Sequence, residues 1–299
     1  MASRWRKFRQ SIEYAAVRGA LALAARAPLE AGRHVGAMVG RSAFDIARVR
    51  RDTSTANVAA SLGVSTEVAG KIARASYANL GRCLLEYAAF ARLTRAEVVD
   101  LTEVEGLEHL ERAVADRKGA ILITAHLGNW ELLGAGVAAR GFPVHYLVGE
   151  QTNTRVDDVM NDLRRRQGIG IISRSIALRK VMQTLGGGQF VAILTDQDAR
   201  KGGVVVDFLG RPASTVRGPA LFAIRRGCPI IPCFIWRDGQ RHRAVVEAPM
   251  RGLPIDDEDE AIRELTQRYT DRVTARIREH PDEYFWPHRR WKSTGVQPM

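Results

Sequence analysis

The chain is poor in cysteine. Its 299 residues include three cysteines, Cys83, Cys228 and Cys233, and these have neither paired-thiol nor zinc-ligand spacing. An odd number also argues against a disulfide framework, so we predict buried free thiols. The histidines at 34, 109, 145, 242 and 280 show no metal-ligand spacing, and we expect neither a metal nor a cofactor.

Long apolar runs are also missing. The longest stretch without a charged residue is 181–195, which has fifteen residues and contains three consecutive glycines. A bilayer-spanning helix needs about 18 or more mostly apolar residues, so no span is predicted. Arg18 and Arg26 enclose only seven uncharged residues and no clear cleavage site follows, which argues against a signal peptide. We therefore expect the protein on the cytoplasmic side of its membrane.

Acidic residues are scarce relative to cations, and the net charge is +12. Residues 1–51 hold eleven Arg or Lys against three Asp or Glu, so this segment carries +8 of that charge. Such a segment predicts an anionic partner, either lipid headgroups or nucleic acid. "MASRWRKFRQ" interleaves Trp5 and Phe8 with cations and precedes an Ala-rich stretch, which favours a membrane surface. The alternative is a solvated arm of an arginine-rich chain.

Apolar periodicity divides the chain into two regions. Residues 10–92 are predicted to be helical, most clearly at 74–93. From residue 104 onward, strand-like runs alternate with helical segments near 106–118, 130–140, 155–167, 175–185 and 216–226. The strand-like runs are 119–125, 143–149, 169–173, 189–195, 229–236 and 243–248.

This alternation predicts an α/β fold with a mostly parallel central sheet flanked by helices. A final helix is expected where Ile262, Leu265, Tyr269, Val273 and Ile277 follow helical spacing. We predict a basic, membrane-associating helical N-terminal region at 1–95 and an α/β core at 96–299, within one continuous domain.

The stretch "TAHLGNWELLG" (124–134) carries the strongest indication of chemistry. His126 stands where the buried strand 119–125 should end, Gly128 and Asn129 suit a turn and a helix N-cap, and Glu131 falls in the first helical turn. A strand–turn–helix corner can fold the imidazole back toward the carboxylate, whereas five positions along one helix would separate them.

A histidine beside a carboxylate can act as a general base. Imidazole has a pKa of about 6.5, and a carboxylate on its second nitrogen holds the tautomer and stabilises the imidazolium. The neighbouring helix N-terminus offers N–H groups for an oxyanion. We predict that His126 and Glu131 are catalytic. The alternative is a partly buried histidine near a glutamate that the helix dipole favours.

Three further stretches accompany this motif in order: "RRDTSTANVAASLG" (50–63), "TDQDARKGGVVVDFLGRPASTVRGPALFAIRRGCPIIPCF" (195–234) and "PDEYFWPHRRWK" (281–292). Together they resemble the bacterial lauroyl/myristoyl acyltransferase family of lipid A biosynthesis, which includes phosphatidylinositol mannoside acyltransferases. The resemblance covers about residues 40–292. It implies a glycerolipid-acyltransferase-like fold and transfer of a fatty acyl chain from a thioester to a lipid hydroxyl.

The resemblance also implies roles for single residues. His126 and Glu131 match the family's catalytic pair, in which many members carry Asp at the second position. Arg164 falls where the family tends to place a basic residue near the active site, so it is a candidate for headgroup binding or oxyanion support. A solvated helix face is the alternative for Arg164.

Two other places are weaker candidates. Asp196 and Gln197 end a predicted strand, where α/β folds gather their sites, although they could simply cap a turn. "FLGRPAST" followed by 217–219 is interpreted as a loop that leads into a helix. There Arg211, Thr215 and Arg217 could meet phosphate, with Thr215 as an N-cap as the alternative. Trp286 is expected to pack against the core.

The partners implied are an acyl carrier protein or acyl-CoA donor, a glycolipid acceptor and an anionic membrane surface, here the cytoplasmic face of the bacterial inner membrane. Arg164 to Arg166 would suit either donor. One rival interpretation is a lipid or thioester hydrolase, although no G-x-S-x-G elbow is present. Another is a nucleic-acid-binding protein, which the pI near 10.2 allows but no familiar motif supports. We expect no nucleic-acid partner.

Overall fold

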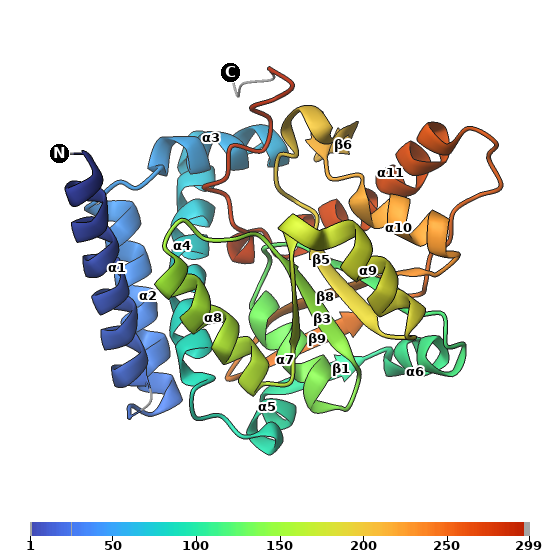
Figure 1. Cartoon of the computed structure of the whole chain (residues 1–299). Coiled ribbons are helices and arrows are strands. Elements are labelled where there is room, and N and C mark those ends of the chain that lie inside the picture. The colour runs from blue at the N-terminus through green and yellow to red at the C-terminus, as the bar shows by residue number, and fades with distance from the viewer. Residues whose placement is uncertain (1, 25, 296–299) are drawn as a thin grey trace.

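A seven-stranded sheet forms the centre of the computed structural model, which describes residues 2–24 and 26–295 (Figure 1). The strand order is β1-β9-β8-β2-β5-β3-β4. Strands β8, β2, β5, β3 and β4 are parallel to one another, whereas β9 runs antiparallel to β8 and parallel to β1. The strands are β1 (Thr102–Glu105), β2 (Ala120–Thr124), β3 (Val144–Val148), β4 (Gly170–Ser173), β5 (Phe190–Leu194), β8 (Ile230–Asp238) and β9 (Arg241–Val246). The predicted mostly parallel sheet is confirmed.

Helices cover both faces of this sheet. Strand β2 is buried at all five positions, as its uninterrupted apolar sequence predicts. Ile121 and Ile123 pack in one core with residues of α9 (Ala177–Gly186), α10 (Gly218–Arg226) and α11 (Glu258–Glu279). Leu122 faces the opposite core, which α7 (Trp130–Ala139), α8 (Thr154–Arg166) and α6 (Leu107–Ala115) help to form.

The N-terminal region is helical, as predicted. It consists of α1 (Ala2–Ala24), α2 (Leu29–Asp45), α3 (Arg51–Leu62), α4 (Thr66–Ala89) and the short α5 (Arg95–Leu101). Helices α1 and α2 lie side by side at the left of Figure 1, and α2 packs along α4. This contact is close because it uses glycine: a Cβ on Gly40 would lie 1.9 Å from the carbonyl oxygen of Tyr77. A boundary near residue 95 between this region and the core stays a prediction.

The structure corrects the interpretation of "FLGRPAST" (208–215), which belongs to residues 204–215. They form an antiparallel hairpin of β6 (Val204–Phe208) and β7 (Arg211–Thr215), not a loop, because Val206 and Phe208 alternate with exposed positions and bury one face. Strand β1 was also missed, since it is only four residues long.

In the basic N-terminal segment, the side chains of Arg4 and Lys7 lie outside the described residues.

Several local predictions are confirmed. Cys83, Cys228 and Cys233 are buried free thiols, and Trp286 is 1% exposed within the core.

Over residues 2–24 and 26–295, no helix has both the length and the apolar character that crossing a bilayer requires.

Candidate active site

The chain after β2 makes the predicted strand–turn–helix corner. Gly128 has φ +57°, and a Cβ there would lie 2.0 Å from the carbonyl oxygen of Ile235, so this turn needs glycine. Asn129 is the N-cap of α7, and its Oδ1 accepts a hydrogen bond from the Leu132 N–H at 3.0 Å. His126 is therefore held between a buried strand and a capped helix.

The carboxylate that holds His126 belongs to Asp196. The Nδ1 atom of His126 lies 2.9 Å from Asp196 Oδ1. Strands β2 and β5 are paired, and the Thr195 N–H donates to the Thr124 carbonyl at 3.0 Å, so the two strand ends are in register. An ionised carboxylate can only accept, so Nδ1 carries the hydrogen and Nε2 keeps its lone pair. The ring can then take a proton at Nε2.

Burial and charge act in opposite directions on this ring. Burial disfavours the imidazolium, but the charge and hydrogen bond of Asp196, helped by the charge of Glu131, raise the pKa of His126 above its ordinary 6.5. Burial likewise opposes ionisation of Asp196, yet His126 and backbone N–H groups hold the pKa of Asp196 below its ordinary value. The pair thus favours proton uptake by the histidine.

Glu131 has a different partner from the expected one. Both of its oxygens are bound by Arg164, with Nε to Oε2 at 3.0 Å and Nη2 to Oε1 at 2.5 Å. Arg164 also donates to Asn161 Oδ1, and its guanidinium lies 5.8 Å from the ring centroids of Tyr87 and Tyr146. In the structure Asp196, and not Glu131, is the hydrogen-bond partner of the ring, because Asp196 lies level with His126 on the neighbouring strand. The catalytic role of His126 and Glu131 stays a prediction. The charge of Glu131 still acts on His126 through space.

Apolar rings enclose the imidazole. The Trp130 ring meets it edge-on with centroids 4.9 Å apart, and the Phe285 ring lies 6.0 Å away. The His126 side chain is 19% exposed. The Gln197 side-chain nitrogen lies 3.4 Å from Nε2, which is long for a hydrogen bond, so a hydroxyl could displace this amide.

The other candidate residues have partners within the protein. Arg211 stacks over Trp291 at 3.3 Å and donates to Ser61 Oγ, and Arg217 forms an ion pair with Asp259 at 2.6 Å. Thr215 is fully buried, and its Oγ1 accepts from Arg290; the N-cap of α10 is Arg217 instead. A phosphate-binding role for Arg211, Thr215 and Arg217 stays a prediction, and the structure gives each of them an internal contact.

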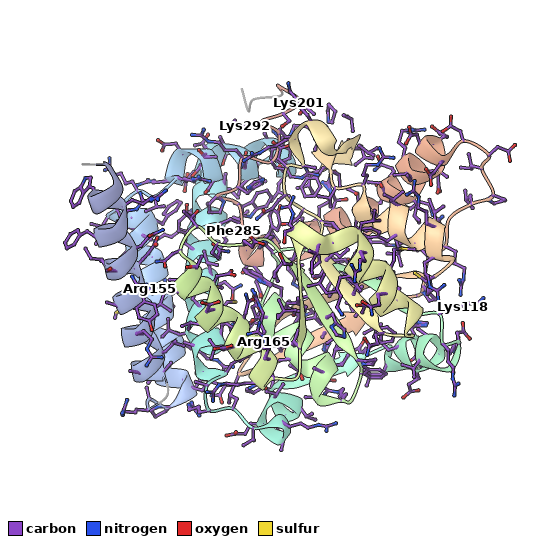
Figure 2. The ribbon with its side chains drawn as sticks, viewed as in Figure 1. Lys118, Arg155, Arg165, Lys201, Phe285 and Lys292 are labelled. Carbon is purple, nitrogen blue, oxygen red and sulfur yellow. The ribbon has the colours of Figure 1, made fainter. Side chains whose placement is uncertain are left out.

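The sequence did not reveal the part that the C-terminal segment plays in this site. The Phe285 N–H donates to the His126 carbonyl at 2.9 Å, and the Asp198 N–H donates to His288 Nε2 at 2.9 Å. The one available signal is the aromatic and cationic stretch "EYFWPHRRW", from which only core packing of Trp286 is predicted. Figure 2 shows Phe285 at the upper edge of the central sheet.

A groove of about 270 Å³ lies elsewhere, between α1 and α8. Leu21, Val159 and Leu163 contribute its apolar lining, and Arg18 and Arg166 are also among its residues. His126 is not one of its lining residues. Within the described parts of the chain, no cluster of three His, Cys, Asp or Glu side chains is arranged to hold a metal ion.

The fold and this corner define a class: an α/β protein with a histidine–aspartate pair at the carboxyl ends of two parallel strands. Comparison with known proteins identifies the family. Residues 2–293 match the family described as "Bacterial lipid A biosynthesis acyltransferase", and the chain belongs to it.

Named relatives are distant. The phosphatidylinositol mannoside acyltransferase of Mycobacterium tuberculosis (strain ATCC 25618 / H37Rv) is 25% identical over 63% of this chain and 59% of its own length. The alignment thus spans less than two thirds of that relative. The lipid A biosynthesis palmitoleoyltransferase of Escherichia coli (strain K12) is 26% identical over 78% of this chain and 75% of its own length. The lauroyltransferase of the same strain is 27% identical over 64% and 62%.

Comparison with solved structures adds little to the family assignment. The solved 1-acyl-sn-glycerophosphate acyltransferase PlsC from Thermotoga maritima gives a TM-score of 0.39 and 14% identity over 75% of this chain and 95% of that one. The glycerolipid-acyltransferase-like character of the fold therefore stays a prediction, beside the observed α/β architecture.

Proposed function

We propose that the protein transfers a fatty acyl chain from an acyl thioester to a hydroxyl group of a lipid A precursor or a related glycolipid. Family membership supports the reaction class. The observation that carries the proposal is the His126–Asp196 pair, because it makes Nε2 the basic nitrogen of the neutral ring, beside an apolar enclosure.

His126 acts as the general base. Its Nε2 removes the proton of the acceptor hydroxyl, and the oxygen attacks the thioester carbonyl carbon. The tetrahedral intermediate collapses with cleavage of the C–S bond, and the imidazolium returns the proton to the leaving thiolate. Asp196 holds the ring and stabilises the imidazolium during these steps.

Glu131 and Arg164 act together beside the base. Their bidentate pair lies in the first turn of α7 and on α8, and Glu131 adds negative charge that favours the imidazolium. The first turn of α7 also offers backbone N–H groups, which are the expected donors to the oxyanion. Arg164 is engaged by Glu131, so we assign it to positioning that carboxylate more than to the donor or the headgroup.

The N-terminal helices are the proposed membrane-binding region. Trp5, Phe8 and Ile12 on α1 are 72%, 56% and 54% exposed, and Met38 and Val39 on α2 are 61% and 59% exposed. Helix α1 is basic, whereas the charges of α2 balance. Exposed apolar side chains beside the cations of α1 suit an anionic lipid interface. We propose peripheral attachment to the cytoplasmic face of the inner membrane.

The donor is an acyl carrier protein or acyl-CoA thioester, and both suit a basic protein. The lipid A and phosphatidylinositol mannoside relatives are named for different acceptors. Both classes of acceptor offer a hydroxyl near anionic groups, so a glycolipid with an anionic headgroup is the proposed substrate class.

Mass spectrometry of lipids tests the proposal. Wild-type protein and His126→Ala are incubated with acyl carrier protein and acyl-CoA thioesters and a bacterial membrane extract. A lipid that gains one acyl mass with wild type alone supports transfer and identifies acceptor and donor. Free fatty acid without an acylated lipid would favour the hydrolase alternative. Turnover by folded His126→Ala equal to wild type would overturn the role of His126.

A further inference from the structure

The motif "RRDTSTANVAASLG" has no part in the mechanism so far, and its asparagine makes unusual contacts. Asn57 on α3 is 4% exposed, and its Nδ2 donates to the backbone carbonyls of Trp286 and His288, both at 3.0 Å. The two amide hydrogens thus tie α3 to residues 283–290, here termed the C-terminal strap. In Figure 1 this segment passes beside α3 and α4.

The C-terminal strap contacts the catalytic corner through its backbone. The Phe285 N–H donates to the His126 carbonyl at 2.9 Å, and the Gly128 N–H donates to the Glu283 carbonyl at 3.1 Å. Leu127 and Tyr284 form an isolated β-bridge. Farther along the strap, His288 Nε2 accepts from the Asp198 N–H, two residues beyond Asp196. The strap therefore spans both strand ends that hold the His126–Asp196 pair.

Phe285 is the strap residue whose ring approaches the base. Its centroid lies 6.0 Å from that of His126, and Trp130 approaches at 4.9 Å. These rings leave the imidazole 19% exposed. Water that reached Nε2 would compete with the acceptor hydroxyl, so the enclosure bears on which nucleophile reacts.

We propose that Asn57 is a positioning residue that holds the C-terminal strap against His126, so that Phe285 keeps water from the base and acyl transfer prevails over hydrolysis. This rests on the proposed transferase function. The hydrogen bonds of Asn57 Nδ2 go to the strap, so Asn57 acts on His126 through the strap. The amide suits this role because both of its hydrogens satisfy carbonyls in an irregular buried segment.

The two competing reactions share one base. In transfer, the acceptor oxygen forms the new C–O bond, the C–S bond breaks, and His126 passes the acceptor's proton to the thiolate. In hydrolysis, water supplies the oxygen and the proton, and the products are a fatty acid and the same thiol. Released thiol therefore counts both reactions, whereas acylated lipid counts transfer alone. Their ratio does not depend on the fraction of protein that is folded.

The test measures this ratio with the full chain, palmitoyl-CoA and a bacterial membrane lipid extract. Asn57→Ala and Phe285→Ala should each raise hydrolysis relative to transfer by on the order of fivefold. Asn57→Ala removes the two hydrogen bonds that hold the strap, and Phe285→Ala removes the ring that faces His126. Arg50→Asn is a second way to loosen the strap if Asn57→Ala folds poorly, because Arg50 Nη1 donates to the Pro287 carbonyl at 3.1 Å. Asparagine also tolerates the positive φ of this position.

Val58→Ala is the matched control. Val58 is the next residue of α3, is fully buried and packs into the core, so its loss lowers stability without freeing the strap carbonyls. Its ratio should equal that of wild type. An unchanged ratio in Asn57→Ala, or an equal change in Val58→Ala, overturns the positioning role and leaves the transferase proposal intact. Thiol release by wild type without any acylated lipid overturns both.

Discussion

Within residues 2–24 and 26–295, two histidine–carboxylate pairs have a nitrogen–oxygen distance below 3.5 Å, and they differ in their suitability for catalysis. At the sheet edge, His126 faces Asp196 at 2.9 Å; in the interior, His242 Nε2 faces Glu86 Oε1 at 3.2 Å. The His126 side chain is 19% exposed, whereas that of His242 is fully buried. A carboxylate beside an imidazole is thus no sufficient sign of an active site.

The charges around each pair explain the difference. Glu86 accepts from Arg33, Arg237 and Asn129 as well as facing His242. Burial lowers the pKa of His242, and the two arginines oppose a third cation there, so the effect of Glu86 is outweighed. Asp196 has the opposite effect on His126, whose pKa is raised. The first pair suits the proposed base, and the second holds a neutral ring within a structural ion cluster.

The largest expected effect separates the two histidines by activity. His126→Gln should lower kcat/KM for acyl transfer by about 10²- to 10⁴-fold, the usual contribution of a positioned general base, with little change in Tm. Steady-state thiol release and lipid mass spectrometry measure it. Transfer at the wild-type rate by this variant would remove the distinction between the pairs.

The next effect concerns stability and the interior pair. Glu86→Leu leaves Arg33 and Arg237 without their buried carboxylate, and it should lower the free energy of unfolding by about 3 to 5 kcal/mol. Urea unfolding of the full chain measures this. Glu97→Leu, at an exposed helix start, is a control expected to cost only about 1 kcal/mol. Equal losses in the two variants would contradict the cluster's structural role.

The Asp196→Asn variant tests whether Asp196 raises the pKa of His126. In the proposed mechanism neutral His126 is the active form, so wild-type kcat/KM should fall as the pH drops through a pKa above 6.5. Without the aspartate charge, burial has the larger effect and lowers the pKa of His126. The acidic limb of the pH–rate profile should therefore shift to lower pH. The maximum rate should fall on the order of a hundredfold, because the imidazolium loses its partner.

The pH–rate profile of Asp196→Asn is compared with that of Asp198→Asn. Asp198 lies on the same loop, and its carboxylate binds Ser293 and the Arg200 N–H instead of the ring. The acidic limb of the Asp198→Asn profile should coincide with that of wild type. A limb that stays in place for Asp196→Asn would show that another group sets the pKa of the base.

The smallest effect is expected at His242. Glutamine can still donate to Glu86 and carries no charge, so His242→Gln should change the free energy of unfolding by about 1 kcal/mol and leave kcat/KM unchanged. A large loss of activity in this variant would mean that the interior cluster is coupled to the site. One such connection is Asn129, which is the N-cap of α7 and donates a hydrogen bond to Glu86.

Sequence patterns predicted the sheet better than the site. All six predicted strand-like runs form strands within about two residues of their expected bounds. Strand β2 shows the reason most clearly, because a strand buried on both faces needs uninterrupted apolar sequence. The β6–β7 hairpin was missed, because Gly, Pro and Arg within 209–212 indicated a loop. His126 and its turn followed from local chemistry, since Gly128 and Asn129 are needed at adjacent positions.

What the sequence by itself determined is therefore local: the buried strand, the glycine turn, the N-cap and the histidine that they present. Tertiary structure decided the partners. Asp196 is 70 residues from His126, and strand pairing brings them together, while Arg164 takes the nearby Glu131. Asn57 reaches the strap across more than 200 residues. Local patterns record backbone preference and burial, whereas a hydrogen-bond partner depends on which distant segments share a sheet edge.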